Sequence, residues 1–134
     1  MNRETRKRMF LEVDLYPVTC ERHSAGRSNL EVLDAAIRGG ARIIQLREKE
    51  FTAGEFYRMA LRFREMTAKA GMLLMINDHV DIALAVGADG VHLGQEDLPF
   101  PAARKLAPEL LIGISAHSRE EALKAQSEGA DYVN

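Results

Sequence analysis

The sequence predicts an α/β fold with parallel strands, and within that class a (β/α)8 TIM barrel of which the chain holds about the first five to six βα units. Short apolar runs alternate with helical patterns, which is typical of parallel βα units. The runs are apolar on both faces, as expected for strands that helices cover. Polar side chains follow the C-terminal ends of successive runs, and this favours a barrel over an open doubly wound sheet.

The first strand and the length of the chain support the same choice. The turn after that strand, CERHSAGRS, lacks the glycine fingerprint that open nucleotide-binding sheets usually carry. Barrels typically need about 250 residues, with a lower end near 200, whereas this chain has 134. We therefore expect a basic N-terminal tail at residues 1–14 and a partial (β/α) barrel domain at residues 15–134 that is incomplete.

The elements follow from hydrophobic period and from helix-capping signals. A serine or threonine three residues before a glutamate is the spacing of a capping box, which marks a helix start. This spacing occurs three times, at Ser28/Glu31, Thr52/Glu55 and Ser118/Glu121. Strands are expected at 15–20, 41–46, 72–76, 90–93 and 110–115, with a sixth beginning at 132–134. Helices are expected at 28–38, 52–71, 80–86, about 99–106 and 120–128. A Gly-Ala-x echo at residues 40, 87 and 129 closes a helix and opens a strand each time.

Composition excludes several classes of protein. Apolar residues make up 46% and charged residues 28% of the chain, and the net charge is −2, so neither nucleic acid nor a membrane surface is an expected partner. The four basic residues within the first eight precede no apolar run, so a solvated tail is expected there rather than a signal peptide. The single cysteine, Cys20, excludes an internal disulfide and fits the cytoplasm. We expect small-molecule partners and leave a homo-oligomer open.

Gln45, Arg47 and Lys49 follow the second strand at a spacing of two. Alternate residues at a strand end point the same way, so all three can face one site. Arg47 offers a planar fork of donors for phosphate oxygens, and Lys49 offers a mobile point charge. The alternative is an exposed basic rim with salt bridges to Glu48 or Glu50.

Asn77-Asp78 and Asp97 follow the third and fourth strands. If these strands are parallel, both acids emerge at the same edge of the sheet, where they suit Mg²⁺ bound through one or two carboxylates and substrate phosphates. Alternatively, Asp78 caps the following helix and Asp97 is a solvated loop acid. With the basic triplet nearby, the two acids make one coherent diphosphate site.

Other polar residues are less decisive. Ser115 ends the fifth strand and is placed either to bind a phosphate oxygen or to form a turn. His92 lies within the fourth strand, where a core histidine is expected, and His117 lies near the proposed mouth. Cys20 has no acid–base partner in the sequence, so a packed thiol is expected.

Three motifs together closely resemble the thiamine-phosphate synthase family, also called thiamine-phosphate pyrophosphorylase. They are QLREK at 45–49, INDHVDIALAVGADGVHLGQEDLP at 76–99 and IGISAHS at 112–118, in family-like order between about residues 15 and 133. The resemblance implies a Mg²⁺-dependent transferase of thiamine biosynthesis on a (β/α)8 barrel. Such enzymes join hydroxymethylpyrimidine diphosphate to thiazole phosphate and release diphosphate. Diphosphate leaves first, and the thiazole nitrogen captures the resulting pyrimidine-methyl cation.

The resemblance also implies roles for individual residues. It implies Asp78 and Asp97 as Mg²⁺ ligands, and Ser115 with Arg47 as the catalytic pair near the reacting groups. The substrate-binding residues that it implies are Gln45, Arg47, Lys49, Asn77 and Ser115.

The chain departs from the family in its extent. Family members continue past the sixth strand with loops that hold the thiazole phosphate, so we expect the 134-residue chain alone to have little synthase activity. One alternative is a thiazole tautomerase relative on the same barrel, which has less use for Asp78, Asp97 and the QLREK set. Another is a non-catalytic phosphometabolite-binding barrel fragment.

Overall fold

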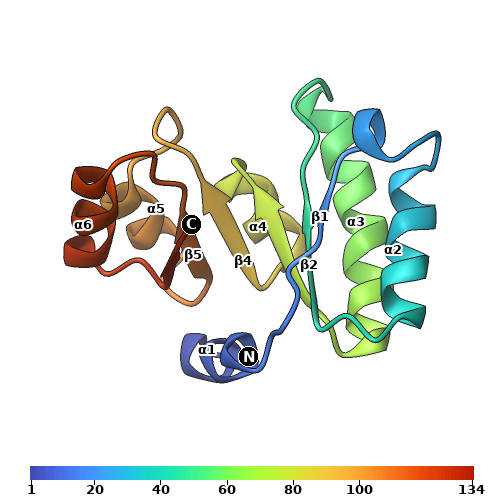
Figure 1. Cartoon of the computed structure of the whole chain (residues 1–134), viewed down its shortest axis with the longest axis horizontal. Helices are drawn as coiled ribbons and strands as arrows, with labels where there is room; N and C mark the ends of the chain where they lie inside the picture. The colour runs from blue at the N-terminus through green and yellow to red at the C-terminus, as the bar shows by residue number, and fades with distance from the viewer.

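A computed structural model describes all residues from 1 to 134. Six parallel strands form one sheet in which neighbours in the sequence are neighbours in space (Figure 1). The strands are β1 Val18–Thr19, β2 Ile43–Leu46, β3 Leu73–Asn77, β4 Gly90–Leu93, β5 Leu111–Ile114 and β6 Tyr132–Val133. This order, with a helix between successive strands, is that of consecutive units of a TIM-barrel-like fold, so the predicted fold class is confirmed.

Helices cover the outer face of the sheet, except for α1, which precedes the first strand (Figure 1). They are α1 Arg3–Leu11, α2 Asn29–Arg38, α3 Ala53–Ala70, α4 Val80–Val86, α5 Phe100–Leu106 and α6 Arg119–Glu128, with a short 3-10 turn at Glu21–His23. None of these helices is long and apolar enough to cross a membrane.

The capping signals place the helix starts correctly. The side chains of Ser28 and Thr52 each accept a hydrogen bond from the amide three residues on. The glutamate at that position accepts in turn from the backbone N–H of Ser28 or Thr52, so both capping boxes are confirmed. Ser118 accepts from the Glu121 amide, but the Glu121 carboxylate accepts from the His117 N–H instead. The third start is therefore capped by a serine without the full box.

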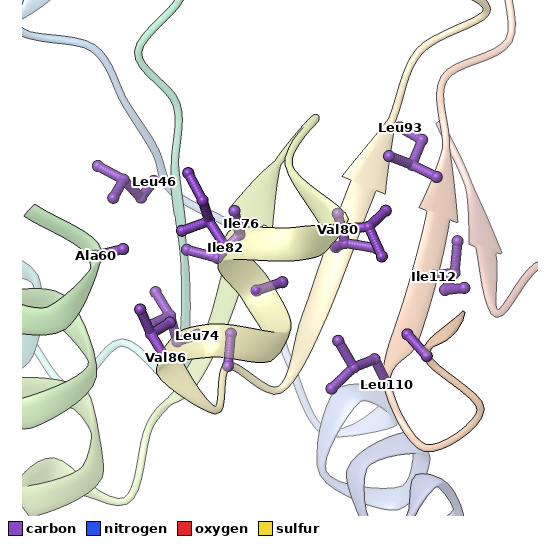
Figure 2. Close-up of a cluster of buried hydrophobic side chains, with 14 of the residues drawn as sticks. Leu46, Ala60, Leu74, Ile76, Val80, Ile82, Val86, Leu93, Leu110 and Ile112 are labelled. Atoms are coloured by element: carbon purple, nitrogen blue, oxygen red, sulfur yellow. The ribbon is translucent and has the colours of Figure 1, made fainter. Parts of the chain in front are cut away.

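Two apolar clusters lie on opposite faces of the sheet. The larger, between sheet and helices, includes Leu74, Ile76 and Ile112 from the strands with Val80 and Val86 from α4 (Figure 2). The smaller lies on the inner face and is built from Ile43, Leu73, Met75 and Leu111, with side chains from α1, Tyr16 and Tyr132 packed against it. Side chains along each strand thus alternate between the helix layer and the interior.

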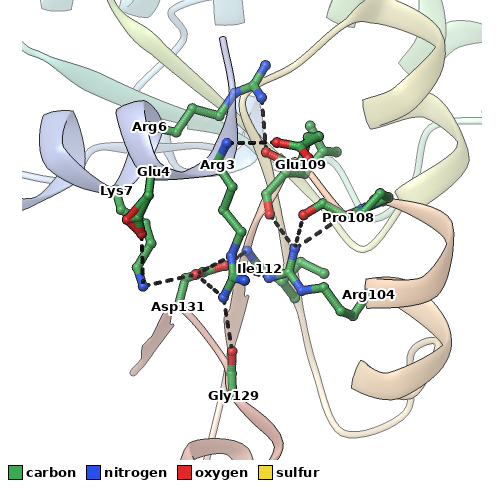
Figure 3. Close-up of polar contacts among 12 residues, drawn as sticks. Arg3, Glu4, Arg6, Lys7, Arg104, Pro108, Glu109, Ile112, Gly129 and Asp131 are labelled. Atoms are coloured by element: carbon green, nitrogen blue, oxygen red, sulfur yellow. Dashed lines mark hydrogen bonds and ion pairs between the residues drawn. The ribbon is translucent and has the colours of Figure 1, made fainter.

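Residues 3–11 correct the expectation of a solvated N-terminal tail. They form α1, which lies across the N-terminal ends of the strands (Figure 1). Arg6 is buried, and its Nε lies 3.2 Å from Asp89 Oδ1. Arg3 reaches Asp131 Oδ1 at 2.8 Å (Figure 3). The sequence alone favours a solvated tail, because nothing local shows that the acidic partners of Arg3 and Arg6 lie more than eighty residues away.

Asp89 and Asp131 give the Gly-Ala-Asp echo a structural meaning. Each buried carboxylate accepts a hydrogen bond from the second amide of the preceding strand: the Leu74 N–H of β3 donates to Asp89 at 2.9 Å, and the Ile112 N–H of β5 donates to Asp131 at 2.8 Å. An arginine from the helix that precedes that strand also binds each carboxylate, Arg64 of α3 at 2.8 Å from Asp89 and Arg104 of α5 at 2.6 Å from Asp131. The echo is therefore a repeated clamp that joins a helix, two strands and α1 at the bottom of the sheet. The first copy of the echo differs, because Arg42 stands in place of the aspartate and pairs with Glu12 at 3.5 Å.

The first strand is shorter than predicted. Only Val18 and Thr19 pair with β2, because Pro17 has no N–H to give and contributes only its carbonyl, which accepts from the Gln45 amide at 2.9 Å. Cys20, expected to be packed in the core, is only half-buried and lines a cavity at the C-terminal end of the sheet.

Candidate functional site

Asp78 and Asp97 meet at the C-terminal edge of the sheet. Asp78 follows β3 directly, and its amide donates to the His92 carbonyl on β4 at 2.8 Å. Its φ of 65° is left-handed, a conformation that aspartate tolerates better than most residues. Asp97 lies in the loop after β4, where its Oδ2 accepts from the Gly94 amide at 2.6 Å. The two carboxyl groups are close enough that the charge of Asp78 affects the pKa of Asp97.

The charges around the pair push the two pKa values apart. Burial raises the pKa of Asp78, but the hydrogen bond and charge of Lys49 outweigh it, so this pKa lies below its usual range. Burial also raises the pKa of Asp97, and the neighbouring Asp78 raises it further. Asp78 is thus the anion that Lys49 holds, while Asp97 lacks a cation of its own.

The basic triplet separates into three different roles. Lys49 Nζ lies 2.5 Å from Asp78 Oδ2. Arg47 is half-exposed, and its guanidinium makes no ion pair or hydrogen bond, so its donors are free for a ligand. Gln45 is buried and points inward, where its amide nitrogen donates to Tyr16 Oη at 3.0 Å. The alternative of a rim paired with Glu48 or Glu50 is not seen, since Glu50 pairs with Arg22 and Glu48 accepts from the Glu21 amide.

A polar cavity of about 170 Å³ opens beside the triplet. Arg22, His23, Arg47 and Lys49 line it together with Cys20, and its acidic lining residues are Glu48 and Glu50. A second cavity, of about 130 Å³, lies on the other side of Asp97, between the loop after β4 and α6. The site is therefore an open, charged rim rather than an enclosed apolar pocket.

Asn77 and Ser115 line the interior below the acids. Asn77 is buried at the end of β3, and its side-chain amide has no protein partner. Ser115 follows β5, and its Oγ lies 2.7 Å from His92 Nε2. His117, by contrast, is exposed, and only its backbone N–H is bonded.

His92 and Tyr132 are the residues that sequence reasoning missed. The prediction treated His92 as a core histidine, and it is buried, but both ring nitrogens are bonded: Nε2 to Ser115 and Nδ1 to Tyr132 Oη at 2.9 Å. The signal in the sequence was the polar residue inside an apolar strand, since a buried histidine needs partners.

The donor set fits a hard cation. No group of three or more His, Cys, Asp or Glu side chains is arranged to hold a metal, so the protein offers two carboxylates, Asp78 and Asp97. Mg²⁺ is often bound through only one or two carboxylates, with waters and phosphate oxygens completing the octahedron. A pair of neighbouring acids, one of them without its own cation, is an arrangement that such an ion stabilises.

These features define a TIM-barrel-like α/β protein with a charged rim of acidic and basic side chains at the C-terminal ends of its strands. A family model described as thiamine monophosphate synthase matches residues 15–134. The chain belongs to the thiamine monophosphate synthase family.

Relatives of known name agree with this assignment. A thiamine-phosphate synthase of Caldicellulosiruptor saccharolyticus is 45% identical over 134 residues, covering 99% of this chain and 61% of the relative. One from Moorella thermoacetica is 50% identical over 121 residues, covering 90% and 58%. A solved thiamine phosphate pyrophosphorylase from Pyrococcus furiosus superposes with a TM-score of 0.84 at 42% identity, covering 91% of this chain and 59% of that one. The chain thus spans about three fifths of the length of the relatives that it matches.

Proposed function

We propose that this chain is the diphosphate-binding part of a thiamine-phosphate synthase, a transferase that couples hydroxymethylpyrimidine diphosphate to thiazole phosphate. The observation that supports this most is the meeting of Asp78, Asp97 and Lys49 at one end of the sheet, with the unpaired guanidinium of Arg47 beside them. The names of the relatives support the same reaction.

The bond changes require charge stabilisation rather than a strong base. The C–O bond between the pyrimidine methylene and diphosphate breaks, and its electron pair stays on the diphosphate oxygen. The thiazole nitrogen then forms the C–N bond with its own lone pair. Arg47 and Lys49 stabilise the negative charge that gathers on the leaving diphosphate, while Ser115 donates to one of its oxygens.

Magnesium and the remaining side chains complete the proposal. Asp78 and Asp97 would hold Mg²⁺, which would supply a Lewis acid for the phosphate oxygens. Asn77 has a free amide for the pyrimidine, and Gln45 has a carbonyl oxygen left over for it after donating to Tyr16. We further propose a cytoplasmic enzyme with small-molecule partners.

Binding of diphosphate tests the proposal on this chain directly. Titration calorimetry with inorganic diphosphate should show binding that requires Mg²⁺, and Asp78→Asn or Asp97→Asn should remove that requirement together with most of the affinity. Asp34→Asn is the control, because this exposed acid pairs only with Arg38 on α2. Equal binding by the wild type and both site variants would contradict the proposal.

Catalysis is tested with both substrates. The chain extended by the C-terminal units of a relative should release diphosphate only when pyrimidine diphosphate and thiazole phosphate are both present. Tight binding without turnover in that protein would favour a non-catalytic binder. Thiazole isomerisation that survives Asp78→Asn would favour the tautomerase reading.

A further inference from the structure

Five side chains form one hydrogen-bonded chain across the inner face of the sheet. It begins at Gln45 on β2 and ends at Ser115 after β5. Gln45 Nε2 lies 3.0 Å from Tyr16 Oη, Tyr16 Oη lies 2.7 Å from Tyr132 Oη, Tyr132 Oη lies 2.9 Å from His92 Nδ1, and His92 Nε2 lies 2.7 Å from Ser115 Oγ. The chain therefore links the interior of the sheet to a residue at the proposed site.

The hydrogen bonds of this side-chain series all run in one direction, from Gln45 toward Ser115. The amide nitrogen of Gln45 can only donate, so Tyr16 accepts from it and uses its own O–H toward Tyr132. Tyr132 then has its O–H left for His92 Nδ1, which must accept. A neutral imidazole with an unprotonated Nδ1 carries its proton on Nε2.

Each member is held in its neutral form. Burial raises the pKa of Tyr16 to about 12, and burial also raises the pKa of Tyr132. Burial lowers the pKa of His92 below its usual range, although Asp78 opposes this. With two phenols and one neutral imidazole, this order gives every contact a hydrogen and also gives the Tyr16 O–H an acceptor, Tyr132 Oη. In the reverse order Tyr132 donates to Tyr16, and the buried Tyr16 O–H is left without an acceptor.

Gly113 makes room for this series of hydrogen-bonded side chains. His92, Gly113 and Tyr132 are partners in register across β4, β5 and β6. A Cβ built at Gly113 would lie 2.0 Å from Cζ of Tyr132, so the tyrosine ring lies directly over the glycine. Only this gap lets Tyr132 cross β5, stack on the His92 ring with centroids 5.5 Å apart and reach its Nδ1.

We propose that His92 is a positioning residue that aims the hydroxyl proton of Ser115 at a phosphate oxygen of the ligand, with Tyr132 and Tyr16 setting its tautomer. His92 Nε2–H donates to Ser115 Oγ, and this contact fills the acceptor side of the hydroxyl. The Ser115 O–H then has no acceptor inside the protein and is left for the rim. The ligand part of this inference rests on the proposed diphosphate site, whereas the tautomer does not.

The tautomer is read first, without any ligand. Nitrogen-15 NMR of labelled histidine in the 134-residue chain should show His92 with a protonated Nε2 and an unprotonated Nδ1. In Tyr132→Phe the Nδ1 loses its donor, so the signal should move toward a mixture of tautomers. Tyr57→Phe, which removes an exposed hydroxyl on α3, should change nothing. A wild-type His92 protonated on Nδ1 overturns the proposal, and this reading needs no variant to fold.

Diphosphate binding is measured second, with Mg²⁺ and inorganic diphosphate as the probe. Ser115→Ala and Tyr132→Phe should each weaken binding by about tenfold, the effect of one hydrogen bond to a charged group. His92→Gln, which keeps an N–H near Ser115, should recover most of the affinity that His92→Phe loses. Full affinity in Tyr132→Phe overturns the proposal. If the wild type binds no diphosphate but shows the expected tautomer, the proposed function fails and the positioning of Ser115 stands.

Discussion

Lys49 Nζ lies 2.5 Å from Asp78 Oδ2, so the cation of the QLREK motif rests on one of the two acids proposed to hold a metal. The lysine therefore has two partners to choose between, the carboxylate and an incoming phosphate. A strong preference for the phosphate is expected once Mg²⁺ neutralises Asp78, because the ion takes over the charge that Lys49 balances.

Lys49→Met should separate these two partners. Without the competing ammonium, Mg²⁺ alone should bind several-fold more tightly, while Mg²⁺-dependent diphosphate binding should weaken by about tenfold. The Lys49 side chain is more than half exposed, so loss of the pair should cost less than about 1 kcal/mol of stability. Calorimetry measures both affinities. Lys69→Met is the control, since Lys69 pairs only with the exposed Glu65 on the same helix, α3. If Lys49→Met changed the Mg²⁺ affinity and the diphosphate affinity in the same direction and by the same factor, Lys49 would not exchange between Asp78 and the phosphate.

Asp97→Asn should stabilise the metal-free chain. Because burial and Asp78 raise the Asp97 pKa, the folded state holds this proton more tightly than the unfolded state does. The favourable contribution is present at low pH and is lost as the pH rises through the raised pKa. At pH 8 the asparagine removes the repulsion and keeps an oxygen for the Gly94 amide, so the melting temperature should rise by a few degrees.

Melting at acid pH provides the control for that variant. Near the ordinary aspartate pKa of about 3.9 the difference between Asp97→Asn and the wild type should shrink. Saturating Mg²⁺ should stabilise the wild type and not the variant. A variant that melts lower than the wild type at pH 8 would show that Asp97 is not destabilised by its neighbour.

Asp89→Ala should damage the bottom of the sheet severely. The change leaves Arg6 and Arg64 without their carboxylate and the buried Leu74 amide without its acceptor. Removing one partner of a buried ion pair costs about 3–5 kcal/mol, and urea unfolding measures this loss. Asp34→Ala removes an exposed partner of Arg38 and should cost less than about 0.5 kcal/mol; a similar loss in both variants would refute the clamp.

Gly113→Ala should displace Tyr132 and loosen β6. The added methyl group meets the tyrosine ring, and overpacking of this kind costs about 1–3 kcal/mol. Gly54→Ala on α3 meets only the end of the Arg58 side chain at 3.5 Å, so it should be neutral or stabilising. Thermal melts compare the two, and equal stability of Gly113→Ala with the wild type would place the ring elsewhere.

The repeating pattern of the sequence was enough to predict the sheet. Short apolar runs and serine or threonine caps act over a few residues, so β3, α3 and α4 follow from local rules. The meeting of Asp78 with Asp97 was also predictable, because parallel strands bring their C-terminal ends to one edge.

Contacts between distant segments could not be predicted. The packing of α1 against the sheet depends on the ion pairs of Arg3 with Asp131 and of Arg6 with Asp89. The proposed role of His92 depends on its hydrogen bond with Tyr132. A single sequence carries no signal for such pairs. Gln45 was predicted to face the same site as Arg47 and Lys49, but its side chain is buried and its amide nitrogen is already bonded to Tyr16. Only the fold reveals this contact.

The central claim is that the two acids and the two basic side chains form one diphosphate site. Its most direct test is a crystal of this chain soaked with Mn²⁺ and inorganic diphosphate. The account predicts one anomalous peak between the carboxylates of Asp78 and Asp97, with diphosphate oxygens on the ion and on the side chains of Arg47 and Lys49. A peak at another place, or diphosphate bound away from both acids, would contradict it.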